Sequence, residues 1–171
     1  MKERKGLVSM KGEPLILLGN ELKVGDVAPD CEVVGKDLKL VSLSSFRGKV
    51  CIISSLPSLD TSVCNIMTRK FNEDAVALGG DVAVLAISMD LPFAQDRWCV
   101  AADVTNVETF SDHRSGAFGE AFGVLIKDLR LLARSVFILD REGVIRYIEI
   151  VDELSSEPDY EAALKAAKEL V

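Results

Sequence analysis

Cysteine gives this chain its most distinctive chemistry. The 171 residues include four cysteines and a single histidine, His113. A Ser-His-Asp triad or a metal site built from several histidines would therefore depend on His113 alone. That residue lies in a polar stretch between Asp112 and Arg114, so we expect it to be solvated and assign it no catalytic role. The residue inventory therefore points to sulfur chemistry, in which the thiolate is the nucleophile.

The spacing of the cysteines excludes two common thiol sites. Cys31, Cys51, Cys64 and Cys99 form no C-x-x-C pair, which argues against a zinc ribbon and against a thioredoxin-type dithiol. Cys51 lies within an apolar run and Cys31 within another extended segment, so we expect both to be structural thiols. The charged first residues lead into no long apolar stretch, which predicts a cytoplasmic protein, where structural disulfides are rare.

Cys64 lies where a predicted strand gives way to a predicted helix. The run at 50–54 is apolar and β-branched, and 61–78 has helical periodicity, so Cys64 falls in the first turn or two of the helix. Free N–H groups and the positive end of the helix dipole favour an anion there, and such a position promotes the nucleophilic thiolate. The alternative is a half-buried cysteine of an amphipathic helix.

Two neighbours of Cys64 fit a reactive site. Thr61 precedes the cysteine by three residues, so its hydroxyl can share that helix face and offer a hydrogen bond near the sulfur. Pro57 has no N–H and a fixed φ, which would stiffen the pocket wall and help to exclude water.

The elements that must position these residues alternate along the chain. Strand patterns cover 7–10, 15–18, 31–34, 38–43, 50–54, 82–87, 107–110, 135–139 and 144–150. Helical patterns cover 61–78, 92–101, 116–122 and 158–170. This order predicts an α/β fold with a central mixed β-sheet, helices on both faces and an N-terminal β-hairpin within residues 1–20. The length predicts one domain, residues 1–171.

Composition excludes two classes of partner. The chain carries 20 Lys and Arg against 27 Asp and Glu, a net charge of −7, so it has no field to attract nucleic acid. No apolar run approaches the roughly 20 residues that a membrane helix needs, and we expect no membrane contact.

Several segments resemble one enzyme family. Pro57-x-x-x-Thr61-x-x-Cys64 is similar to the active-site motif of peroxiredoxins, and the full segment PSLDTSVC resembles their thiol peroxidase subfamily. The resemblance covers most of the chain in order and extends to four further segments: 90–99, 133–136, 151–154 and 157–164.

This resemblance implies a thioredoxin-like fold and a role for each matching residue. Cys64 would attack a hydroperoxide as thiolate and become a sulfenic acid. Arg134 would hold the thiolate and the peroxide oxygens, with Thr61 bonding the same peroxide. By its residue type alone, Arg134 fits a surface arginine in an ion pair better, and only the resemblance favours the active-site role. Cys99, 35 positions later (99 − 64), would react with the sulfenic acid to form an intrasubunit disulfide. If both cysteines lie in helices, those helices must unwind locally before the disulfide can form.

The resemblance also bears on partners. It implies hydrogen peroxide and organic hydroperoxides as substrates, thioredoxin as reductant and a homodimer, and it implies no metal, haem or flavin. Phe93 could form an apolar entrance for organic hydroperoxides or simply pack in the core. Trp98, beside Cys99, is expected to anchor its helix, although it could also lie near the docking surface of the reductant.

Other thiol-based functions fit less well. A cysteine-dependent phosphatase needs a glycine-rich loop and an arginine six positions after the cysteine, where this chain has Lys70. A redox sensor that reports peroxide through Cys64 would use the same residues as a peroxidase. Turnover separates the two, because an enzyme consumes hydroperoxide continuously.

Overall fold

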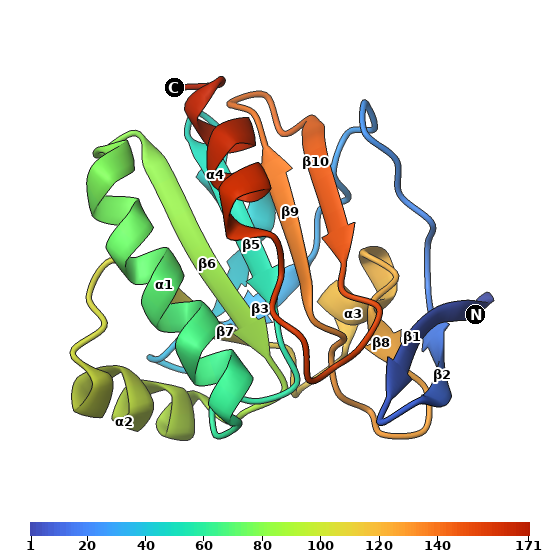
Figure 1. The fold of residues 1–171 in the computed structure, drawn as a ribbon. Coiled ribbons are helices and arrows are strands. Elements are labelled where there is room, and N and C mark those ends of the chain that lie inside the picture. Colours follow the sequence, from blue (N-terminus) through green and yellow to red (C-terminus); the bar gives the residue numbers. More distant parts are fainter.

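A seven-stranded mixed sheet forms the centre of the molecule (Figure 1). The computed structural model describes residues 1–171. The strands are β3 (Glu32–Val34), β4 (Leu40–Ser42), β5 (Val50–Ser55), β6 (Val82–Ser88), β7 (Glu108–Ser111), β9 (Ser135–Leu139) and β10 (Ile145–Ile150). They pair in the order β10-β9-β5-β6-β7-β3-β4; β5, β6 and β7 are parallel, and every other pairing is antiparallel. The predicted mixed sheet is confirmed.

The central strands owe their position to continuous apolar runs. Every residue of β5 is buried, and so is every residue of β6 except Val82. Such runs are typical of strands that are covered on both faces, whereas alternation of apolar and polar residues is typical of strands with one solvent-exposed face. The parallel register runs from Val50 opposite Val82 to Ser55 opposite Ile87, so β5 and β6 end at the same edge of the sheet.

Helices cover both faces, as predicted. They are α1 (Ser62–Leu78), α2 (Pro92–Ala102), α3 (Ala117–Ala121) and α4 (Tyr160–Lys168), with a 3₁₀ turn, η1, at Leu43–Phe46. In Figure 1, α1 and α4 lie in front of the sheet and α3 lies behind it. Phe71 of α1 and Ala163 of α4 share a core cluster with Ile52, while Phe118 of α3 belongs to a second cluster on the opposite face.

The N-terminal hairpin is confirmed and forms part of the core. It consists of β1 (Glu3–Met10) and β2 (Glu13–Leu18), and a third strand, β8 (Leu125–Ile126), pairs with β2. Val8 and Leu17 are buried in the same cluster as Phe118. The sequence did not predict β8, because two residues carry no periodicity.

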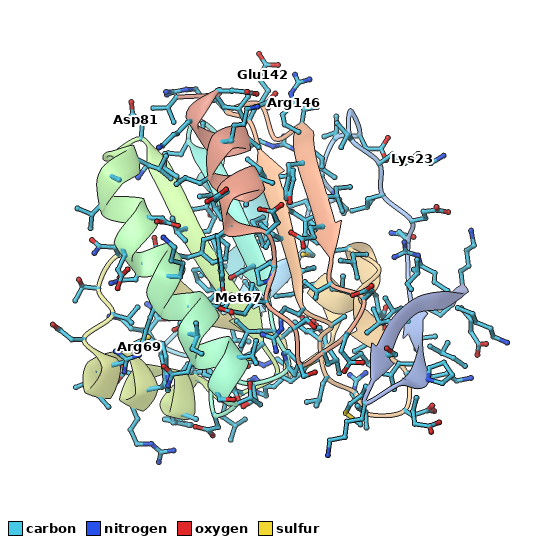
Figure 2. All side chains as sticks on the ribbon, in the orientation of Figure 1. Lys23, Met67, Arg69, Asp81, Glu142 and Arg146 are labelled. Carbon is cyan, nitrogen blue, oxygen red and sulfur yellow. The ribbon has the colours of Figure 1, made fainter.

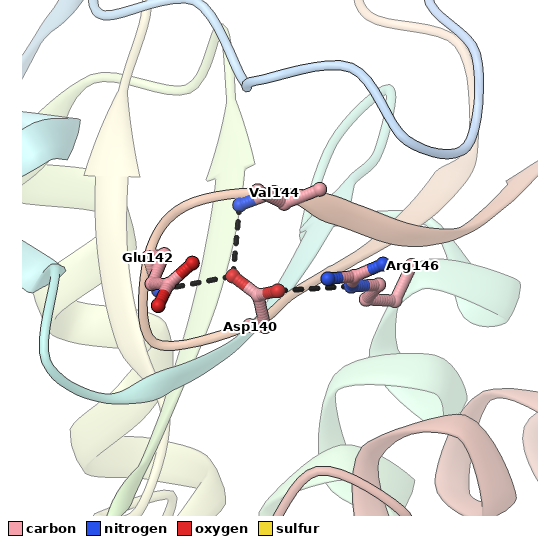
Figure 3. Close-up of polar contacts among 4 residues, drawn as sticks. All are labelled: Asp140, Glu142, Val144 and Arg146. Carbon is pink, nitrogen blue, oxygen red and sulfur yellow. Dashed lines mark hydrogen bonds and ion pairs between the residues drawn. The ribbon is translucent and has the colours of Figure 1, made fainter.

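A carboxylate closes the β9–β10 hairpin. Asp140 accepts hydrogen bonds from the backbone N–H of Glu142 and Val144 at 2.9 and 3.0 Å and from Arg146 Nε at 2.8 Å (Figure 3). These contacts lower the pKa of Asp140 below its ordinary value, although burial of the carboxylate opposes them.

The helix ends differ slightly from the predicted ones. The last helix begins at Tyr160 rather than at Pro158, because Asp159 is its N-cap and accepts a hydrogen bond from the Ala162 N–H at 3.0 Å. None of the helices has the length and the apolar character needed to cross a membrane.

Gly123 is a position where only glycine fits. Its φ is +69°, and an added Cβ would lie 1.9 Å from the Asn20 carbonyl oxygen. We expect Gly123→Ala to lower the free energy of unfolding by at least about 2 kcal/mol, because the backbone after β2 must move. Gly6→Ala, with φ +77° and open space around the added Cβ, should cost only about 1 kcal/mol. Urea unfolding measures both, and equal losses would contradict the steric argument.

Candidate active site

Three chain segments meet at the edge where β5 ends. Antiparallel pairing sets Ser55, the last residue of β5, opposite Ser135, the first residue of β9. Arg134 immediately precedes β9, so this register places it beside the start of the loop that leads from β5 to Cys64. The Ser55 hydroxyl donates to the Ala133 carbonyl at 2.7 Å and contacts the Ser135 hydroxyl at 2.5 Å, which ties the two strands together at this point.

Cys64 is the third residue of α1 and has no exposed surface. Thr61 is the N-cap, with extended backbone, and its hydroxyl accepts a hydrogen bond from the Cys64 N–H at 3.3 Å. The same hydroxyl donates to the Ser58 carbonyl at 3.0 Å. The predicted helix start is thus confirmed to within one residue. In this arrangement Thr61 bonds the backbone of Cys64, whereas the sequence had suggested a bond near the sulfur.

Arg134 contacts the Cys64 sulfur. Its Nη1 donates to Cys64 Sγ at 3.1 Å and lies 3.7 Å from Met67 Sδ. Its Nε and Nη2 both donate to the Leu154 carbonyl, at 3.2 and 2.7 Å. Figure 2 shows Met67 on the side of α1 that faces the sheet. Arg134 is only 2% exposed, so the alternative of a surface arginine in an ion pair is wrong.

No carboxylate neutralises this buried guanidinium. The ion pairs of the chain involve other residues, and the acceptors around Arg134 are one carbonyl and two sulfurs. A buried charge without a counter-ion is costly. Cys64 is the one acceptor among these that can carry a full negative charge, as a thiolate.

Two sources of positive potential act at Cys64. At an effective dielectric constant of ~20, opposite unit charges about 3 Å apart attract by roughly 5 kcal/mol, before the cost of removing both from water. A helix N-terminus contributes ~0.3–1 kcal/mol, or up to ~2 kcal/mol when partly buried. Both contributions have the same sign at the sulfur, and the guanidinium is the charge in direct contact with it.

Asp90 fixes the loop that leads to Cys64. Its carboxylate accepts from the Ser58 hydroxyl at 2.7 Å, the Leu59 N–H at 2.8 Å and the Ser88 hydroxyl at 2.7 Å. Gln95 of α2, which is buried, donates to the same Ser88 hydroxyl at 3.0 Å. A continuous chain of hydrogen bonds thus joins the loop before α1 to the helix that carries Cys99.

Cys99 is half-buried on α2 and makes no contact with Cys64. Its sulfur lies 3.9 Å from the Thr109 hydroxyl of β7 and borders a groove between α2, β7 and the turn at 35–37. Burial raises the pKa of the Cys99 thiol, and the Thr109 contact opposes that shift. All four cysteines are free thiols in this structure.

The other two cysteines lie away from this site. Cys51 is buried in β5 and Cys31 is half-buried; both pack in or against the cluster that contains Phe118, on the face opposite α1. Burial raises the pKa of Cys51 to about 11 and that of Cys31 to about 12. Both environments suit the structural roles predicted for these thiols.

The structure agrees with some of the predictions for the other singled-out residues and contradicts others. Pro57 is buried in the loop before α1, and Trp98 packs against the cluster that contains Phe71, which fits an anchor for α2. Phe93 is 68% exposed, so the core-packing alternative for it is wrong. His113 is half-buried and its Nδ1 lies 2.8 Å from the Ser111 hydroxyl, so it is not simply solvated as expected.

Two contributions to the site were not recognised from the sequence. The Leu154 carbonyl is a backbone group, which no residue pattern reveals. Asp90 lies in a segment that resembles the family, but its role in holding the loop was not predicted, because its partners Ser58 and Leu59 lie more than thirty residues earlier. No group of three His, Cys, Asp or Glu side chains is placed to hold a metal ion.

Known proteins share both the sequence and this architecture. Residues 23–164 match the Redoxin family. The thiol peroxidase of Bacillus subtilis strain 168 is 56% identical over 164 residues, covering 96% of this chain and 98% of the relative. The thiol peroxidase of Listeria innocua is 55% identical over 161 residues, 94% of this chain and 97% of the relative.

A solved structure of a peroxiredoxin-like protein from Aquifex aeolicus superposes with a TM-score of 0.88 at 43% identity, covering 98% of this chain and 99% of that one. Sequence and fold thus agree with a thiol-based peroxide reductase of thioredoxin-like architecture. The chain belongs to the thiol peroxidase family of peroxiredoxins.

Proposed function

We propose that this enzyme reduces hydrogen peroxide and organic hydroperoxides through Cys64. The observation that carries the proposal is the 3.1 Å contact between Arg134 Nη1 and Cys64 Sγ at the first turn of α1. A guanidinium in that place stabilises the thiolate and presents further N–H groups to the oxygens of a bound peroxide.

In the proposed first step, the Cys64 thiolate attacks one oxygen of the O–O bond. The S–O bond forms as the O–O bond breaks, the leaving oxygen takes up a proton, and the products are a cysteine sulfenic acid and water or an alcohol. The sulfur is oxidised by two electrons and the peroxide is reduced by two. A low thiol pKa alone does not make this step fast, because nucleophilicity falls with pKa. Arg134 therefore has to stabilise charge on the departing oxygen as well.

Thr61, Pro57 and Phe93 have supporting roles in this proposal. The Thr61 hydroxyl, which now donates to the Ser58 carbonyl, would turn to hydrogen-bond the peroxide. Pro57 forms a wall that excludes water, and Phe93, largely exposed, offers an apolar surface to organic hydroperoxides. Because Cys64 has no exposed surface, the loop before α1 must shift to admit a substrate.

Cys99 resolves the sulfenic acid in the second step. Its thiolate attacks the Cys64 sulfur as the S–O bond breaks, the leaving hydroxide takes up a proton to become water, and the product is an intrasubunit disulfide. Such a bond needs Cα atoms about 4.4–6.8 Å apart. Since Cys64 lies in α1 and Cys99 contacts β7 from α2, both helices have to unwind locally before the sulfurs can meet.

We further propose the cellular setting that the family implies. Thioredoxin reduces the disulfide and restores both thiols, so that the protein acts in antioxidant defence and cell redox homeostasis. Residues 1–171 act as one peroxidase domain, in a homodimer, in the cytoplasm, without a metal, haem or flavin.

Substitution of the attacking cysteine tests the reaction itself. We expect Cys64→Ser to abolish hydroperoxide consumption in an assay that couples thioredoxin, thioredoxin reductase and NADPH, because serine cannot form a sulfenic acid. Cys31→Ser, on the other face of the sheet, is the matched control and should turn over continuously. Retained turnover in Cys64→Ser would contradict the assignment. A wild-type protein that is oxidised only once would be a redox sensor.

Substitution of the resolving cysteine tests the second step. We expect Cys99→Ser to reduce about one hydroperoxide per subunit and to stop at a sulfenic acid that a selective reagent traps. Peptide mapping of the oxidised wild type should find a Cys64–Cys99 crosslink within one chain. A covalent dimer on a non-reducing gel would show that the pairing is intermolecular instead.

Substitution of the buried arginine tests its role in charge stabilisation. We expect Arg134→Lys to slow formation of the sulfenic acid by about 10²-fold, because one ammonium cannot bond the Leu154 carbonyl in two directions and still contact the sulfur. Arg146→Lys, on the surface, is the control. Rapid-quench mass spectrometry of the first turnover gives the rate, and circular dichroism checks folding. A rate equal to that of the control would rule out this role.

A further inference from the structure

The segment that holds Arg134 is itself held by the N-terminal hairpin. Residues 151–154 lie between β10 and α4. The Ser9 N–H donates to the Asp152 carbonyl at 2.7 Å, and the Leu154 N–H donates to the Ser9 carbonyl at 3.0 Å. Leu154 is therefore fixed from two sides: its N–H bonds the hairpin, and its carbonyl accepts both bonds from Arg134.

Glu153 completes this junction. Its carboxylate accepts from the Ser9 hydroxyl and the Lys11 N–H, each at 2.9 Å, and from the Gly12 N–H at 3.4 Å. The Lys11 bond is the main cause, with the Ser9 bond next, of a Glu153 pKa lowered to about 2, so this side chain is a carboxylate at neutral pH. These three donors come from the turn between β1 and β2 or the strand before it, and a fourth, the Ser155 hydroxyl at 3.2 Å, comes from the same segment as Glu153.

The hairpin has a separate anchor on its other side. Leu17 and Leu18 of β2 pair with Ile126 and Leu125 of β8, and Glu3 forms an ion pair with Lys127. The hairpin is thus bonded to β8 on one side and to the 151–154 segment on the other. The backbone bonds of Ser9 and the side-chain bonds of Glu153 together join the hairpin to the segment that carries the Leu154 carbonyl.

We infer that Glu153 is a positioning residue for the reaction at Cys64: by binding the β1–β2 turn, it holds the Leu154 carbonyl in the place that orients the Arg134 guanidinium toward the sulfur. The inference rests on the proposed peroxidase function.

The geometry makes the sulfur contact sensitive to that carbonyl. Because the carbonyl accepts from both Nε and Nη2 of Arg134, it sets the plane of the guanidinium and leaves Nη1 directed at Cys64. Hydrogen bonds weaken steeply as their angle departs from linearity, and a displacement of about 1 Å at a catalytic group can cost up to ~10²-fold in rate. A small shift of Leu154 would therefore reach the reacting sulfur.

The experiment compares Glu153→Gln with the matched control Glu3→Gln. The first variant replaces an acceptor oxygen with an amide NH₂ that faces N–H donors, whereas the second removes a hairpin ion pair on the side of β8. In a Cys99→Ser background we expect Glu153→Gln to slow sulfenic acid formation by about tenfold, and Glu3→Gln to stay near the parent rate. Rapid-quench mass spectrometry measures both, and Glu153→Asp, which retains the charge, should recover part of the loss.

A second readout separates positioning from stability. Thiolate absorbance at 240 nm is titrated with pH, and the Cys64→Ser curve is subtracted so that the difference reports Cys64. The other thiols interfere little below about pH 9, because burial raises the pKa of Cys51 to about 11 and of Cys31 to about 12, and also raises that of Cys99. Tyr160, whose pKa burial raises far above neutral, does not titrate in that range.

The outcomes are distinct. A Glu153→Gln titration displaced toward higher pH, with a slower first turnover, supports the positioning role. A lowered melting temperature with an unchanged titration and an unchanged rate overturns it, as does an equal effect of Glu3→Gln. If the wild type reduces no hydroperoxide, the proposed function fails, and the titration alone still decides whether Glu153 acts on the Arg134–Cys64 pair.

Discussion

A buried guanidinium without a carboxylate partner is the constraint around which the site is arranged. Arg134 is nearly inaccessible, and its hydrogen bonds go to one carbonyl and two sulfurs. In a poorly hydrated interior, such a cation needs a nearby anion. The thiolate of Cys64 can supply it, and the proposed reaction uses this same contact.

Sheet topology is what makes this contact possible. The antiparallel register of β5 with β9 brings Arg134 beside the exit of β5, and the parallel register of β5 with β6 brings Asp90 there from the other side. One segment supplies the cation and the other fixes the loop before α1. The central strand can be flanked in this way because its apolar residues allow complete burial.

The closed arrangement favours the Arg134–Cys64 contact that the proposed first step uses, but both substrate entry and the second step require it to open. Cys64 is enclosed, Cys99 contacts β7, and the hydrogen bonds through Asp90, Ser88 and Gln95 hold both helix starts in place. Enclosure strengthens the electrostatic contact at the sulfur, since few waters screen it. Formation of the proposed disulfide has to break these hydrogen bonds, so the stability of this network would determine the lifetime of the sulfenic acid.

Much of the local structure was predictable from the sequence. The apolar runs of β5 and β6, the periodicity of α1, the cysteine in its first turn and the N-terminal hairpin all follow from short-range patterns, and the structure confirms them. Family-like motifs also singled out Cys64, Cys99, Thr61 and Arg134. Local spacing suffices here because helix periodicity, caps and turns depend on residues only a few positions apart.

Only the tertiary structure decided how these residues meet. Arg134 and Cys64 are 70 positions apart, and Asp90 reaches a loop about thirty positions earlier. Glu153 contacts a turn more than 140 positions away, and the Leu154 carbonyl is a group that every residue possesses. Strand register and backbone hydrogen bonding determine these contacts, and neither is encoded in the type or spacing of neighbouring residues. The sequence determined which thiol stands at a helix start; the fold decided which charge lies against it and what holds that charge in place.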